Sequence, residues 1–379
     1  MFKKILLGGT ALVGAAAMTL PANAGQVGSK DAMSVTLGGE FRFIVGFSDQ
    51  DVSAGYGRGY EFHGDEVEVK INAKNTADNG LEYGVGIELN GGGSDGTAAD
   101  EAFAFIDSDQ WGRVEMGDQD DATDRMHVSS IDILVGRAGS DGDVADFIQF
   151  GSANAISAPG VDSTSDDTKL TYFSPRFGGF QVGASLTPDT GVDSGTADLF
   201  GETDNDGDFE NVFGVAANWE GSFDEVGIIV SAIGEFGDSE TASGADTEGE
   251  IETFGFGAVL TYAGFGVGGS YVDFAEKGIA QAARAAGADS GSYYDLGVSY
   301  STGPYGISLG WFESSVSNAT GSGGDTDVQI LSIDASYTVA PGWELAAGLN
   351  FVDAENINAT AVPVNNEGTL FLISNEFKF

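Results

Sequence analysis

The sequence lacks cysteine, and after its first residues it lacks any long apolar run. With no cysteine among 379 residues, the chain has neither a disulfide scaffold nor thiolate chemistry. Beyond residue 24, no segment offers the ~20 uninterrupted apolar residues that a membrane-spanning helix needs. If the protein crosses a membrane, it must therefore do so with another kind of element.

Basic residues are also scarce. The chain has 15 Lys and Arg residues against 59 Asp and Glu, a formal net charge of −44. Such an excess of negative charge excludes nucleic acid as a natural partner, because phosphates would be repelled. A strongly charged chain can be disordered, but 26 Phe, 11 Tyr and 4 Trp argue for a structured apolar surface.

The N-terminus has the layout of an export signal. Lys3 and Lys4 precede the apolar stretch 5–18, and Ala22-Asn23-Ala24 supplies a small-residue cleavage site. We expect residues 1–24 to be a cleaved signal peptide, so that the mature protein begins at Gly25 and residues 25–379 form one domain. Without the two signal-peptide lysines, the formal net charge is −46.

From Val35 to the end, the chain alternates bulky apolar residues with glycine, small or charged residues. In the last segment, Phe371, Ile373 and Phe377 share one face, and the other face carries Glu376 and Lys378. The polar faces of these segments hold too many charges and glycines to cover a compact core. The pattern instead indicates strands with a lipid-facing apolar side and a wet interior, as in a membrane β-barrel.

Sixteen such segments follow one another, which predicts an all-β, sixteen-stranded antiparallel transmembrane barrel. Seven short turns alternate with eight long polar loops, the asymmetry expected in the outer membrane. Aromatic residues such as Tyr83, Trp219 and Tyr262 recur near strand ends, where rings favour the headgroup level. The predicted strands are 35–47, 61–75, 81–90, 101–107, 112–118, 168–174, 179–187, 211–219, 225–236, 251–262, 264–273, 292–300, 304–313, 327–337, 343–352 and 369–379.

The third long loop, Gln119–Asp167, has about 49 residues, which is too long for an ordinary connection. It contains the apolar stretches 131–135 and 147–150, which a solvated segment would lack. Sixteen strands enclose a channel too wide for side chains alone to fill. We therefore expect this loop to fold into the barrel lumen.

Three short motifs suggest other chemistry. The segment 264–269 matches a dinucleotide-binding glycine pattern, and Ser308 lies in a Gly-x-Ser-x-Gly pattern, but both fall within predicted strands, so an enzyme is not expected. Asp204, Asp206 and Asp208 resemble a calcium loop without EF-hand spacing. They leave open a loosely bound Ca²⁺ on an external loop, beside the simpler interpretation of a solvated loop. No other cofactor is expected.

The chain resembles the sixteen-stranded general porins of Gram-negative bacteria, in their alphaproteobacterial branch. The resemblance covers 25–379 and is carried by the segments 35–43, 111–118 and 172–180 and by the terminal Phe379. It implies a third loop that narrows the channel, with loop acids facing a basic wall. It also implies a homotrimer, and a C-terminal aromatic residue, Phe379, that the outer-membrane insertion machinery recognises.

Position in the family pattern assigns Arg42 and Arg113 to the basic wall of the constriction. Lys70 and Lys169 are added because they fall on the lumen face. The acidic candidates on the loop side are Asp118, Asp120, Asp121, Asp124 and Asp132.

The expected function is an outer-membrane channel for passive diffusion of small polar solutes and ions, with a preference for cations because of the overall negative charge. The alternative is a substrate-selective channel. Stacked aromatic residues on the lumen face would favour that alternative, but the Phe, Tyr and Trp residues fall mainly on the lipid face.

Overall fold

The computed structural model describes residues 33–51, 59–91, 99–136, 139–151, 155–161, 163–191, 208–240, 248–358 and 364–379. The predicted signal peptide and its cleavage site lie outside the described residues, as do Asp204 and Asp206.

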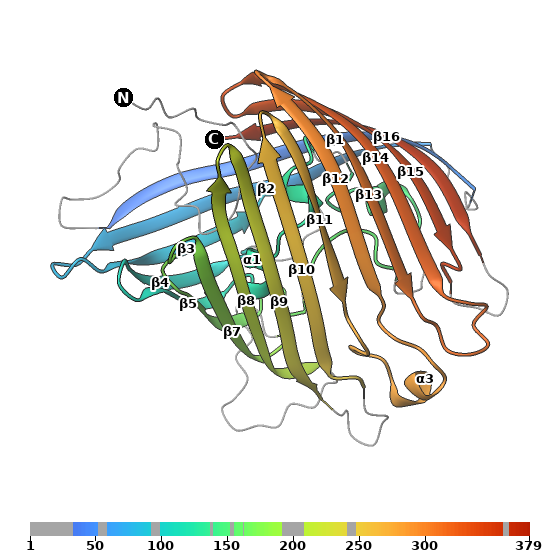
Figure 1. Cartoon of the computed structure of the whole chain (residues 1–379), viewed down its shortest axis with the longest axis horizontal. Coiled ribbons are helices and arrows are strands. Elements are labelled where there is room, and N and C mark those ends of the chain that lie inside the picture. The colour runs from blue at the N-terminus through green and yellow to red at the C-terminus, as the bar shows by residue number, and fades with distance from the viewer. Residues whose placement is uncertain are drawn as a thin grey trace.

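The described residues form one closed antiparallel barrel in which each strand pairs with its neighbours in sequence and the last pairs with the first (Figure 1). The sixteen predicted strands are confirmed, with ends that differ by a few residues. None of the helices in the described ranges is long and apolar enough to cross a membrane. The strands are β1 Ser34–Gln50, β2 Tyr60–Thr76, β3 Glu82–Asn90, β4 Ala102–Ser108, β5 Gly112–Asp118, β6 Thr168–Phe173, β7 Phe180–Asp189, β8 Phe209–Phe223, β9 Val226–Ser239, β10 Ile251–Tyr262, β11 Phe265–Asp273, β12 Ser292–Thr302, β13 Tyr305–Val316, β14 Thr326–Ala340, β15 Trp343–Glu355 and β16 Asn366–Lys378.

The alternation of the strands sends large apolar side chains outward. Phe41 and Phe371 are 41% and 40% exposed, whereas their inward neighbours Arg42 and Leu372 are buried. Asn375 interrupts the apolar face of β16, and its side-chain oxygen accepts a hydrogen bond from Trp343 Nε1 at 2.8 Å. On β16 the outward face is therefore an apolar surface suited to lipid, and the side chain of Asn375 on this face is paired.

Aromatic rings pair near the short turns, in agreement with the prediction that aromatic residues gather near the strand ends. The ring centroids of Tyr305 and Tyr337 lie 5.2 Å apart, and those of Trp343 and Phe377 lie 5.6 Å apart. At this end of the barrel such rings can sit at the level of the lipid headgroups.

The described parts of residues 119–167, called loop 3 below, lie inside the ring of strands, where Figure 1 shows α1. Loop 3 contains α1 (Ala122–Met126), a 3-10 turn η1 (Ser130–Asp132) and α2 (Val144–Phe147). The α1 helix contacts β6 to β9, η1 contacts β10 to β12, and α2 contacts β1. The loop therefore follows the inner wall through most of its circumference. A further short helix, α3 (Gln281–Ala285), lies at the end of the barrel away from the C-terminus (Figure 1).

Side chains of the wall satisfy the backbone of loop 3. A buried chain segment without regular structure leaves amide groups that need partners, because an unpaired buried amide is costly. Four strands, β7, β9, β12 and β13, supply those partners: the backbone amides of loop 3 donate to inward Ser, Asp and Tyr oxygens, in the pairs Ala122–Ser185 (2.7 Å), Val128–Ser231 (3.0 Å), Ser130–Asp295 (2.5 Å), Val135–Ser308 (3.1 Å) and Gly160–Tyr293 (3.1 Å).

Inward glycines let loop 3 approach the wall this closely. A β-carbon at Gly257 would overlap the backbone carbonyl of Val128, and one at Gly297 would lie 2.9 Å from the Cβ of Ser130. Backbone cannot yield as a flexible side chain can. The sites where a β-carbon would meet loop 3 lie on eight strands, at Gly46, Gly183, Gly214, Gly257, Gly266, Gly268, Gly297, Gly306, Gly310 and Gly368.

An apolar cluster packs between loop 3 and the inner faces of β1 and β16. Phe147 and Ile148 pack with the inward residues Ile44, Leu370 and Leu372, all of which are less than 9% exposed. Burial of one such side chain contributes about 1.5–3 kcal/mol. This contact explains why β1 and β16 carry bulky apolar residues on their lumen face.

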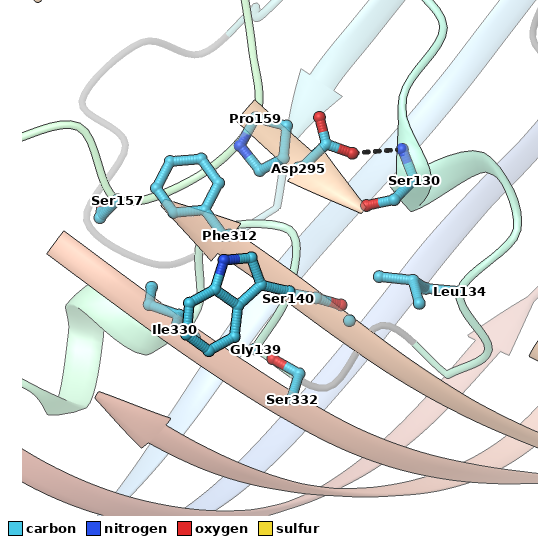
Figure 2. A pocket seen from close by; sticks show the side chains of 12 residues that line it. Ser130, Leu134, Gly139, Ser140, Ser157, Pro159, Asp295, Phe312, Ile330 and Ser332 are labelled. Carbon is cyan, nitrogen blue, oxygen red and sulfur yellow. Dashed lines mark hydrogen bonds between the residues drawn. The ribbon is translucent and has the colours of Figure 1, made fainter. Parts of the chain in front are cut away.

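Aromatic residues fall mainly on the lipid face, as expected, but a few also occur on the lumen side. Tyr293 and Phe312 are 1% and 6% exposed, with ring centroids 5.5 Å apart. Loop 3 covers them, leaving a cavity of only about 20 Å³ lined by loop residues and β12 to β14 (Figure 2). These rings therefore support the loop and are not available to a solute.

The close packing of loop 3 against the inward glycines predicts what happens when a side chain is added to the wall. We expect Gly257→Val to push the Val128 segment away from β10, because the new Cβ overlaps a backbone carbonyl. The cost should be about 1–3 kcal/mol of stability, with a lower melting temperature and an altered single-channel conductance.

The control is Ala258→Val on the same strand, where the residue is exposed on the lipid face. It should leave both properties unchanged. Wild-type stability and conductance in Gly257→Val would show that loop 3 does not lie against β10.

Candidate functional site

A hollow of about 390 Å³ lies between loop 3 and the wall formed by β1 and β2. A volume of this order admits a small hydrated solute. Seven carboxyl groups line it, against two cationic side chains. The carboxyl groups belong to Glu40, Asp65, Glu66, Glu68, Asp141, Asp143 and Asp146, and the cations are Arg42 and Lys70.

Arg42 joins the wall to loop 3. Its side chain is 6% exposed and forms an ion pair with Asp65 of β2. On the loop side, its Nη1 lies 2.8 Å from Asp141 and its Nη2 lies 3.4 Å from Asp143. A buried guanidinium needs such partners, since its donors cannot reach water. Arg42 therefore faces two carboxyl groups of loop 3 from the inner wall.

Lys70 is paired within the wall. Its ammonium group lies 2.8 Å from Glu68 and also contacts Glu88 on β3. Both cations of the hollow are therefore compensated by neighbouring carboxylates, and the remaining acids give the space an excess of negative charge.

Arg113 lies in a different part of the interior from Arg42. It pairs with Glu115 and stacks over the ring of Phe105 at 3.9 Å. Glu115, which is fully buried, also pairs with Arg125 of loop 3. The structure thus places Arg113 in an Arg–Glu–Arg chain that connects β5 to α1.

Lys169 is 3% exposed and points into the base of loop 3. Its ammonium group donates to the backbone carbonyls of Gln119 and Ser165. Gln119 begins the loop and Ser165 lies close to its end, so Lys169 joins the two stems of the loop.

The five predicted loop acids do not gather around Arg42. Asp121 caps α1 by accepting the amides of Thr123 and Asp124 at 2.8 and 2.9 Å. Asp132 accepts the amide of Ser129 at 2.9 Å in a capping box. Capping of this kind satisfies helix-end amides and fixes the shape of the loop.

The other three predicted acids lie at the end of β5 and at the start of loop 3. Asp118 accepts a hydrogen bond from the Thr168 hydroxyl, and Asp124 is half-buried in the first turn of α1. Asp120 has carboxylate oxygens within 4.8 Å of those of Glu101 and Asp166. Burial, together with the neighbouring negative charges, raises the pKa of Asp166 to about 7.

The loop acids that contact Arg42, Asp141 and Asp143, are absent from the sequence prediction. Burial, and then the nearby Asp141 carboxylate, raise the pKa of Asp143 to about 9, so Asp143 holds a proton at neutral pH and loses it in alkaline solution. Both lie in Ser140-Asp141-Gly142-Asp143, a segment whose alternation of glycine and acid resembles an ordinary polar loop.

One group of external-loop acids has the ligand chemistry that Ca²⁺ prefers. Asp208, from the predicted divalent-ion loop, has carboxylate oxygens within 4.8 Å of those of Asp189 and Glu240. Hard oxygen donors of this kind could hold a divalent cation.

Comparison with known proteins agrees with this architecture. Residues 9–357 match the sequence profile of the Gram-negative porins. An uncharacterised protein of Rickettsia conorii is 23% identical over 343 residues, which cover 73% of this chain and 75% of that protein. A similar protein of Rickettsia felis is 24% identical over 344 residues, covering 73% and 75%.

Solved structures show the same fold. An anion-selective porin from Comamonas acidovorans superimposes with a TM-score of 0.61 at 14% identity, covering 92% of this chain and all of the other. The trimer form of the outer membrane protein OmpT of Vibrio cholerae gives a TM-score of 0.60 at 14% identity, with 92% and 100% coverage.

A closed sixteen-stranded barrel, a lipid-facing apolar surface and an inward third loop beside a charged hollow describe a water-filled channel of the outer membrane, not an enzyme. With the profile match over most of its length, the chain belongs to the Gram-negative porin family.

Proposed function

We propose that this porin passes small hydrophilic solutes and ions by passive diffusion and prefers cations. The observation that carries the preference is the hollow between loop 3 and the wall, where seven carboxyl groups surround two cations that are themselves ion-paired. Rings of fixed negative charge concentrate cations and repel anions at a narrow passage. The formal charge of −44 for the chain acts in the same direction.

A substrate-selective channel would need a side-chain surface that binds one solute. Within the described residues, the neighbouring lumen aromatics Tyr293 and Phe312 are covered by loop 3. The walls of the hollow are mainly charged. These features support diffusion of many small polar solutes over recognition of a single one.

Cation preference predicts the outcome of a reversal-potential measurement in a KCl gradient across a planar bilayer. The wild type should be cation-selective. Arg42→Ala should raise the ratio of potassium to chloride permeability, because it removes a positive charge from the hollow and frees Asp65 and Asp141. Conductance should also rise, because the tether between β1 and loop 3 is lost.

Arg113→Ala is the comparison. The resemblance proposes that Arg113 also lines the constriction, and a comparable rise in cation preference would support that role. If neither variant changes the reversal potential, the basic residues do not control ion choice. A wild-type channel without selectivity, or with anion selectivity, would contradict the proposed preference.

We also propose that the protein assembles as a homotrimer. Support comes from the family and from the trimer form of the similar OmpT structure. The outward Ala347 on β15 is small enough for close approach, but Gly39 on β1 is not bare, because the ring of Phe379 lies over it. Light scattering in mild detergent should give a trimeric mass. A monomeric mass would contradict the proposal.

Phe379 is proposed to act in assembly. Its backbone exchanges two 3.0 Å hydrogen bonds with Gly39 beyond the end of β16, and its ring is 52% exposed on the lipid side. An accessible aromatic ring at the end of the chain can be recognised by the insertion machinery.

Deletion of Phe379 should therefore reduce the amount of protein inserted into the outer membrane, with normal conductance for the channels that do insert. Phe379→Tyr keeps an aromatic ring and should insert like the wild type. Normal insertion of the deletion variant would overturn the assignment.

A further inference from the structure

The wall of the hollow contains an irregularity in β2. Between β1 and β2, Phe41 pairs with Val67 but the next residue, Arg42, pairs with Asp65. Glu66 is therefore an extra residue on one strand, which is a β-bulge. Its φ of 39° lies in the left-handed region, which is uncommon for a residue with a side chain.

The bulge changes which residues face the lumen. In a regular strand adjacent residues point to opposite sides. Here Asp65 contacts Arg42 and Glu66 Oε1 lies 3.7 Å from the same guanidinium, and both acids line the hollow. Two consecutive carboxyl groups thus enter the lumen at one level of the barrel.

The same bulge keeps the lipid face apolar on both sides of the irregularity. On the N-terminal side of the bulge, Tyr60 and Phe62 are 47% and 60% exposed on the outward face. On the C-terminal side, Val67 and Val69 face outward, so the outward positions change from even-numbered to odd-numbered residues. Straight continuation of the strand would turn these two rings into the lumen, so the sequence requires an extra residue at this level.

The two acids have different surroundings. Asp65 is bound to Arg42, whereas the Glu66 side chain is 43% exposed within the lumen. Across the hollow, Oδ2 of Asp143 has no hydrogen-bond partner, and the Asp143 side chain is only 7% exposed. An accessible carboxylate and a buried carboxyl oxygen without a hydrogen-bond partner therefore line the same space.

We propose that the β-bulge at Asp65–Glu66 determines the ion selectivity of the channel, with Glu66 as the residue that passing cations contact. The ligands are small monovalent cations, either inorganic ions or primary ammonium groups, which carry positive charge and need oxygen acceptors. The inference rests on the proposed cation preference and assigns it to one backbone feature.

The experiment compares two neutral substitutions on β2 by reversal potential in a KCl gradient. Glu66→Asn removes the carboxylate and keeps a residue that tolerates the left-handed conformation. Glu61→Asn removes the same charge from the same strand, at a position paired with Gly46 nearer the end of β2. Glu66→Gly, which relieves the backbone strain, is a second test of the charge.

We expect the permeability ratio of potassium to chloride to fall roughly twofold or more in both Glu66 variants, since a fixed unit charge in a narrow aqueous gap changes ion occupancy by that order. Glu61→Asn should stay close to the wild type. Channel insertion and heat-modifiable gel migration should be normal in all three.

The outcomes separate this inference from the proposed function. If the wild type does not prefer cations, the proposed preference fails. If the wild type prefers cations but the Glu66 variants retain its ratio, or if Glu61→Asn lowers the ratio equally, the preference stands and the role of the bulge is overturned.

Discussion

The close contact between loop 3 and the inner wall is the constraint on which the rest of the structure depends. About 49 residues without long regular elements can be buried in a barrel only if their amides find partners and their side chains find space. Inward serines and Asp295 supply acceptors, and inward glycines supply the space. The loop is therefore built into the wall, and the passage is confined to the side that it leaves uncovered.

The excess of acidic residues divides into structural and exposed groups. Asp121, Asp132 and Asp295 bind backbone amides and fix the loop. Around the hollow, Glu66 stays accessible, while Arg42 and Lys70 neutralise their immediate neighbours. The charge density at the passage thus depends on which carboxyl groups are bound to the backbone amides of loop 3 and which stay accessible. The net charge of the chain alone does not determine it.

The sequence predicts the strands well because the two environments of a membrane barrel act on every second residue. The alternation identifies sixteen strands. The length and the apolar stretches of the third loop predict that it folds into the barrel lumen. Pairing between distant segments is harder to predict: Arg42 and Asp141 are 99 residues apart, and no local pattern joins them. The bulge at Glu66 is visible in the sequence as a break in alternation, because Tyr60 and Phe62 cannot share a face with Val67 in a regular strand. This break can be assigned to a bulge only when the register with β1 is known.

Disulfide trapping tests the central claim most directly, because the chain contains no cysteine of its own. A β-carbon at Gly306 on β13 would lie 3.0 Å from the Cβ of Val135 in loop 3, near the separation that a disulfide spans after a small adjustment. With Val135→Cys and Gly306→Cys combined, mild oxidation of the folded protein should leave no thiol that can be alkylated after unfolding. Val135→Cys with Gly84→Cys, on the opposite wall, should keep both thiols open to alkylation after unfolding, which is needed because Val135 is buried. Free thiols in the first pair after oxidation would contradict a loop that is packed against the wall.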